Sequence, residues 1–168
     1  MIEELRNPLS GDYCHLKNFI LSHDFPWFRF SNTTRDVGDD NIGMFSHTFL
    51  ERPEVNNGYS KSNSPYIDSC IDVLREIIIF NKIDFNLFYR VSANLVAAGP
   101  SVEKTVEHND HKFPHTNIII YLSDSDGDTV VGKDIYTPKE DRVIIFRGAH
   151  YHCTPTEKDR IVLVGTFL

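Results

Sequence analysis

Thr116-Asn-Ile-Ile-Ile-Tyr121-Leu-Ser-Asp-Ser-Asp-Gly127-Asp-Thr129-Val-Val131 is an apolar run, a short acidic segment and a second apolar run. β-branched and aromatic residues are enriched in strands, whereas Ser, Asp and Gly favour turns. We therefore expect two strands joined by a hairpin turn. The acidic turn does not match a calcium loop, because Lys133 stands where the last carboxylate ligand would be needed.

Runs of the same kind continue on both sides of this stretch. We expect strands at 88–96, 101–108, 116–122, 129–131, 142–146 and 161–167. Short strands with regular turns, following a helical N-terminal part, predict an antiparallel barrel or jelly roll with helices packed on one face. The fold class is therefore mainly β with N-terminal helices.

The N-terminal part carries helical patterns. Asp12 is the expected cap of a helix that ends near residues 24–26, and Ser64-Pro65 is expected to open a second helix. Polar segments at 31–41 and 51–63 are expected to be loops, one of which could act as a lid. We expect a single domain over 1–168, with a helical part at about 1–83 and a jelly-roll core at about 84–168.

Composition limits the classes of function. At 168 residues with 40% hydrophobic residues, the chain is long enough to bury a core. Its net charge of −7 argues against nucleic acid as a partner. Three cysteines without a Cys-x-x-Cys pair argue against a disulfide framework, and no apolar run could cross a bilayer. We expect a soluble, cytoplasmic protein without membrane contact.

A candidate metal site begins at His108-Asn-Asp110. Side chains at positions i and i+2 of an extended segment point to the same side, so the imidazole and the carboxylate would face one point. His150 or His152, from a distant segment, would add a second imidazole, and parity cannot separate these two. Two imidazoles and one carboxylate on one face of an ion suit non-haem Fe(II) and oxygen chemistry.

The same ligand set is also compatible with zinc hydrolysis. The chain lacks a His-Glu-x-x-His motif, which argues against a protease-type zinc site. His111 and His115 are poorer third ligands, because each would have to fold back through a tight loop to complete the face.

Around this candidate site, the chain resembles the Fe(II)- and 2-oxoglutarate-dependent dioxygenases, in particular their prolyl 4-hydroxylase-like branch. The family pattern of Thr, apolar run, Tyr-Leu, acidic turn and Gly-x-Thr is matched by residues 116–129, and its later segment by Arg142-Val-Ile-Ile-Phe146-Arg-Gly148-Ala-His-Tyr-His152. The likeness covers about 90–167. Phe25-Pro-Trp27-Phe and Arg90-Val-Ser-Ala-Asn94-Leu also resemble small phage-encoded members.

The resemblance implies a double-stranded β-helix of the cupin-like kind and names the site residues. Register against Gly148 selects His152, so the implied metal ligands are His108, Asp110 and His152. Arg160, eight residues after His152, would pair with the distal carboxylate of 2-oxoglutarate, with Tyr121 and Thr116 as further cosubstrate residues.

The implied activity is a hydroxylation that uses O₂ and oxidatively decarboxylates 2-oxoglutarate to succinate and CO₂. Fe(II) and 2-oxoglutarate are the expected cofactors, and ascorbate is a further candidate. A protein side chain or a small molecule is favoured over nucleic acid as the substrate. The alternatives are a non-catalytic jelly-roll module with a lapsed metal site, and a cupin-like isomerase or hydrolase that uses its metal as a Lewis acid.

Overall fold

The computed structural model describes residues 1–33 and 40–168. In chain order the elements are β1 (Glu3–Leu5), α1 (Gly11–Ile20), β2 (Phe28–Phe30), β3 (Met44–Glu51), the 3-10 helix η1 (Pro53–Val55), β4 (Lys61–Ser62), α2 (Ile67–Phe80), β5 (Phe88–Val96), β6 (Thr116–Tyr121), β7 (Thr129–Val131), β8 (Asp134–Tyr136), β9 (Val143–Phe146), β10 (Tyr151–His152) and β11 (Arg160–Phe167).

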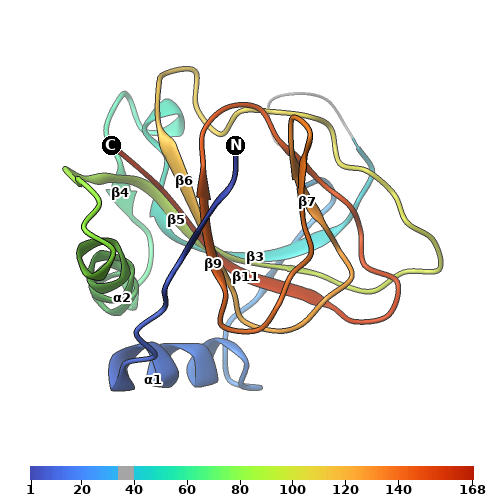
Figure 1. Cartoon of the computed structure of the whole chain (residues 1–168), viewed down its shortest axis with the longest axis horizontal. Helices are drawn as coiled ribbons and strands as arrows, with labels where there is room; N and C mark the ends of the chain where they lie inside the picture. Colours follow the sequence, from blue (N-terminus) through green and yellow to red (C-terminus); the bar gives the residue numbers. More distant parts are fainter. Residues whose placement is uncertain (34–39) are drawn as a thin grey trace.

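The strands form two antiparallel sheets, as expected for a jelly roll (Figure 1). The larger sheet has the order β1-β9-β6-β11-β5-β3-β2, with β4 paired to β3, and the smaller sheet has the order β10-β7-β8. Strand β11 lies between β5 and β6, with Leu163 opposite both Ala93 and Ile120. The prediction of a mainly β, jelly-roll fold is confirmed.

Strand β6 is buried along its whole length because both faces of the large sheet are covered. Ile118 and Ile120 pack in the main core with residues of α1 and α2, and Ile119 and Tyr121 point into a second cluster with Val131 of the small sheet. Figure 1 shows both helices on the same side of the large sheet. The alternation of side chains along a strand thus separates a helix-facing layer from an inner layer.

Helix α2 packs closely against the large sheet at Gly165 of β11. A Cβ atom at this position would lie 3.0 Å from Cγ2 of Ile118 and 3.2 Å from Cδ1 of Leu74. Because such distances are tighter than ordinary van der Waals contact, glycine lets the helix and the sheet approach each other here.

Several expected elements differ in detail. Strand β5 has the predicted bounds, but residues 101–108 form only isolated bridges, Lys104 with Cys153 and His108 with His150. The part expected to be helical also contains β1 to β4, and the expected loop at 51–63 includes η1 and β4. Ser10, rather than Asp12, caps α1 by accepting a hydrogen bond from the backbone N–H of Tyr13. Of the expected loop at 31–41, residues 34–39 lie outside the described residues.

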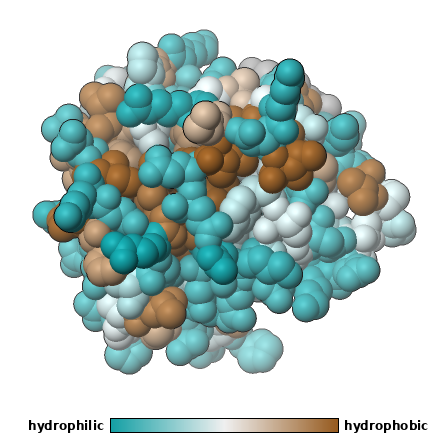
Figure 2. All heavy atoms as spheres, viewed as in Figure 1, coloured by the Kyte–Doolittle hydropathy of each residue, from teal (hydrophilic) through white to brown (hydrophobic). Residues whose placement is uncertain are grey.

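Hydrophilic side chains dominate the surface. In Figure 2 hydrophilic side chains cover most of the visible face, and hydrophobic atoms gather in a band across its upper half. Within residues 1–33 and 40–168, no helix is both long and apolar enough to span a membrane.

Candidate functional site

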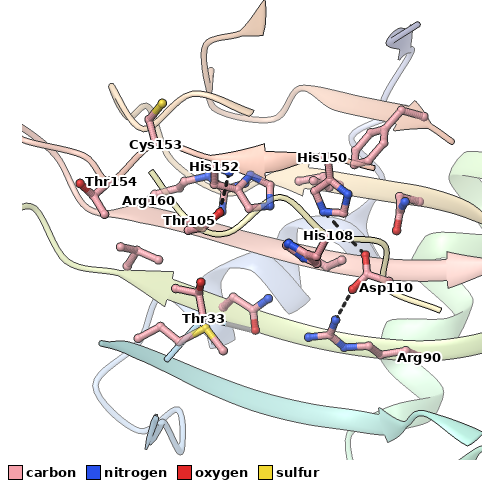
Figure 3. A pocket seen from close by; sticks show the side chains of 17 residues that line it. Thr33, Arg90, Thr105, His108, Asp110, His150, His152, Cys153, Thr154 and Arg160 are labelled. Carbon is pink, nitrogen blue, oxygen red and sulfur yellow. Dashed lines mark hydrogen bonds and ion pairs between the residues drawn. The ribbon is translucent and has the colours of Figure 1, made fainter. Parts of the chain in front are cut away.

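Three side chains of the metal-binding kind meet between the sheets (Figure 3). They are His108, Asp110 and His150, and each offers one ligand atom that lies within 4.8 Å of the other two. Backbone hydrogen bonds of 2.9 Å in both directions join residues 108 and 150 and bring their rings to a centroid distance of 4.5 Å. Asp110 lies two residues after His108, and its Oδ2 is 3.8 Å from Nε2 of His150.

Both imidazoles can present a lone pair to a metal ion. Nδ1 of His108 lies 2.8 Å from the carbonyl oxygen of Val106, which can only accept. This contact places the proton on Nδ1 and leaves Nε2 free to bind. Burial lowers the pKa of His150 to about 4, so that this ring is neutral at pH 7.

Asp110 is the anionic member of the cluster. Burial by itself would raise its pKa, but neighbouring positive charge, above all the guanidinium group of Arg90 and also that of Arg52, outweighs this and holds the pKa well below the ordinary range. The carboxylate is therefore ionised at all physiological pH values. The donor set of two imidazoles and one carboxylate is chemically suited to Fe(II).

His152, the third ligand expected from register against Gly148, is not a member of this cluster. His150 and His152 both line the same cavity, because residues two apart in an extended strand point to the same side. The backbone pairing places His150, not His152, opposite His108. Nδ1 of His152 instead lies 3.1 Å from both Nη2 of Arg160 and Oγ1 of Thr129. Geometry therefore favours His150 where the sequence register favoured His152.

Arg160 opens β11 and is 3% exposed. Its Nη2 donates to Oγ1 of Thr129 over 3.1 Å, and its Nε has no hydrogen-bond partner in the described part of the chain. Among the described residues, no carboxylate forms an ion pair with it. A buried charge without a counter-ion is costly, so this guanidinium is suited to binding an anion from outside the chain.

Tyr121 lies beside this guanidinium, with its ring centroid 5.7 Å from Cζ of Arg160. Its hydroxyl and Oγ1 of Thr129 are 2.7 Å apart, so Thr129 connects Tyr121 with Arg160. Gly127 allows the guanidinium to lie here. A Cβ at Gly127 would come within 2.9 Å of the carbonyl oxygen of Cys153 and within 3.1 Å of Cδ of Arg160.

Thr116, expected to contact the cosubstrate, lies elsewhere. It is an odd number of positions from Tyr121 on β6, so it points to the other face, and its Oγ1 accepts a hydrogen bond from Nε of Arg147. Asn117 points inward instead, where both polar atoms of its side-chain amide are buried without a hydrogen-bond partner among the described residues. Counting strand parity back from Tyr121 would have selected Asn117.

A single cavity of about 60 Å³ contains both parts of the site. His108, Asp110 and His150 line it together with Arg160. Arg90, Asn117, His152 and Thr105 add polar groups, and Met44, Val96 and Phe146 add apolar surface. An anion bound at Arg160 would therefore share one enclosed space with an ion bound at the three ligands.

Comparison with known proteins gives a consistent fold. No protein-family model and no curated protein matches this sequence. Among solved structures, a 2OG-Fe(II) oxygenase family oxidoreductase from Burkholderia pseudomallei aligns at a TM-score of 0.66 and 15% identity, covering 84% of this chain and 72% of that one.

Two prolyl hydroxylases are also similar in structure. A prolyl-4-hydroxylase from Pseudomonas putida aligns at a TM-score of 0.59 and 13% identity, covering 99% of this chain and 91% of that one. A prolyl hydroxylase from Trichoplax adhaerens, solved with a hypoxia inducible factor peptide fragment, aligns at 0.62 and 12%, covering 99% and 83%. The fold of this chain is that of the 2OG-Fe(II) oxygenases, including those of the prolyl hydroxylase branch.

Proposed function

We propose that this chain is an Fe(II)- and 2-oxoglutarate-dependent dioxygenase whose metal ligands are His108, Asp110 and His150. One observation carries the proposal: the two imidazoles and the carboxylate share a cavity with a buried guanidinium that has no acidic partner among the described residues. The first group suits Fe(II), and the second suits a carboxylate at the far end of a small dianion.

With iron and 2-oxoglutarate bound, the site would supply oxidative decarboxylation to succinate and CO₂ and the oxidation of a C–H bond of the substrate. The chain supplies binding and orientation. Arg160 would donate to the distal carboxylate, with the hydroxyl groups of Tyr121 and Thr129 beside it. His152 would orient Arg160, because its Nδ1 accepts from the guanidinium.

Hydroxylation of a protein side chain or of a small molecule is the reaction we favour. The net charge of −7 argues against a nucleic acid substrate, since phosphate binding requires cationic surface. Ascorbate is proposed only as a reductant that keeps the iron ferrous.

Succinate formation without added substrate tests this proposal. Purified protein would be incubated with Fe(II), ascorbate and 2-oxoglutarate, and compared with Asp110→Ala, His150→Ala and His152→Ala variants. We expect the first two variants to lose metal binding and succinate formation together. His152→Ala should keep the metal and require more 2-oxoglutarate, because it removes only an acceptor for Arg160.

The opposite pattern for the two histidines would reassign the third ligand to His152. If the unaltered protein binds metal but neither binds 2-oxoglutarate nor forms succinate, the dioxygenase proposal fails. A non-catalytic jelly-roll module would then be the better description.

A further inference from the structure

The two oxygens of the Asp110 carboxylate have different neighbours. Oδ1 accepts a hydrogen bond from Nη1 of Arg90 over 2.6 Å, and Nη2 of Arg52 lies 3.8 Å from the same oxygen. Oδ2 is on the side of His150, 3.8 Å from its Nε2. Figure 3 shows the two dashed contacts leaving the carboxylate toward Arg90 and toward His150. The carboxylate thus has one oxygen facing the arginines and one facing the imidazoles.

Both arginines are held close to Asp110 by the large sheet. Arg90 is on β5, which pairs with β3 and β11, and its side chain is 15% exposed. Arg52 directly follows β3, and its Nη1 donates to the backbone carbonyl oxygen of Asp110 over 3.1 Å. The loop that carries Asp110 is therefore attached to two neighbouring strands at both its backbone and its side chain.

We propose that Arg90 is a positioning residue that holds Asp110 in one-oxygen ligation of the metal. The inference rests on the proposed function. A carboxylate can bind a cation through one oxygen or through both. If both oxygens of Asp110 bound the ion, the second would occupy a position that the cosubstrate or O₂ needs. A short charge-assisted hydrogen bond to Oδ1 keeps that oxygen away from the ion.

Arg90 suits this role better than a lysine would. The guanidinium is planar and presents its N–H groups in a fixed direction, whereas an ammonium group on a flexible stem is a point charge. Arg90 also brings a positive charge near the metal, which by itself would weaken cation binding. Arg90 therefore has two opposed effects on metal affinity, because it orients the carboxylate ligand but repels the cation. The number of water molecules on the bound ion is thus the more informative quantity.

The test uses Mn(II), bound to the whole chain without 2-oxoglutarate. Water proton relaxivity per bound Mn(II) would be measured for the unaltered protein, Arg90→Met, Arg90→Lys and the control Arg75→Met, whose arginine is exposed on α2. We expect Arg90→Met to lose about one metal-bound water, because the released oxygen takes its place. Arg90→Lys should recover part of this loss, and Arg75→Met should change nothing.

A second measurement on the unaltered protein does not depend on the folding of a variant. The infrared difference spectrum between Mn(II)-loaded and metal-free protein should show the wide separation of carboxylate stretching bands that one-oxygen ligation produces. A narrow separation, or equal relaxivity in the unaltered protein and Arg90→Met, would overturn the inference. If the unaltered protein binds no Mn(II), the proposed metal site itself fails.

Discussion

Replacing Arg160 by methionine would separate the proposed cosubstrate site from the proposed metal site. Arg160 is 3% exposed and has hydroxyl and imidazole contacts but no acidic partner among the described residues. In the absence of 2-oxoglutarate the variant should be at least as stable as the unaltered protein, because it removes a buried charge that lacks a counter-ion. With 2-oxoglutarate bound, the unaltered protein should be the more stable of the two.

The expected loss of affinity follows from the burial of this residue. Truncating one partner of a buried, hydrogen-bonded charge pair costs about 2–5 kcal/mol. A value of about 3 kcal/mol is reasonable here, since Thr129 and Tyr121 remain to contact the carboxylate. At about 1.4 kcal/mol per factor of ten, the dissociation constant of 2-oxoglutarate should rise roughly 140-fold.

Stability measured with and without cosubstrate provides the assay. Mn(II)-loaded protein would be unfolded with urea at a 2-oxoglutarate concentration of about 100 times the dissociation constant of the unaltered protein. That protein should gain about 2.7 kcal/mol, and Arg160→Met only about 0.3 kcal/mol. Arg75→Met, which alters an exposed arginine of α2, should match the unaltered protein. Equal gains in all three proteins, or a loss of Mn(II) binding in Arg160→Met, would refute the reasoning.

Three further outcomes are expected. Gly127→Ala should weaken 2-oxoglutarate binding about tenfold, because the new Cβ would press on Cδ of Arg160 at 3.1 Å. Calorimetric titrations should show this loss together with unchanged Mn(II) binding, and an unchanged affinity for 2-oxoglutarate would contradict the prediction. Gly165→Ala should lower the free energy of unfolding by about 2 kcal/mol, because its Cβ would overpack against Ile118. An unaltered urea midpoint would argue against close packing at Gly165. The pKa of His150 is lowered to about 4 in the folded protein, so the unfolded chain takes up this proton first as the pH falls from about 6.5. This one group should therefore cost metal-free protein about 2 kcal/mol of stability between pH 7 and pH 5, so urea unfolding of His150→Asn should show a loss that is smaller by about this amount.

Local patterns predicted much of the β core. Strand β5 has the bounds expected from its run of residues, and the alternation within β6 explains why its two faces enter different cores. Strand β3 was missed, although Phe45-Ser-His-Thr-Phe49 is rich in strand-forming residues, because the surrounding segment contains two helices. In place of the expected strand at 101–108, the chain forms two isolated bridges, one at Lys104 and one at His108.

The structure places the three residues that the resemblance assigns to the cosubstrate in different ways. Arg160 and Tyr121 lie together as expected, whereas Thr116 is on the opposite face of β6. The family resemblance gave the spacing of these residues along the chain, but this spacing does not show to which face of the strand each side chain points. The face depends on whether two residues of the strand are an even or an odd number of positions apart. The same parity places Asn117 in the cavity, where its amide has no hydrogen-bond partner within residues 1–33 and 40–168.

By itself, the sequence determined the mainly β fold, the placing of His108 and Asp110 on the same side of the chain, and the chemical nature of the candidate ligands. These properties follow from side-chain period and residue type, which are local. Tertiary structure decided that His150 lies opposite His108, that His152 contacts Arg160, and that Arg90 binds one oxygen of Asp110. Such contacts depend on the register between strands distant in the chain, and a shift of two residues preserves the side-chain pattern while exchanging one histidine for the other.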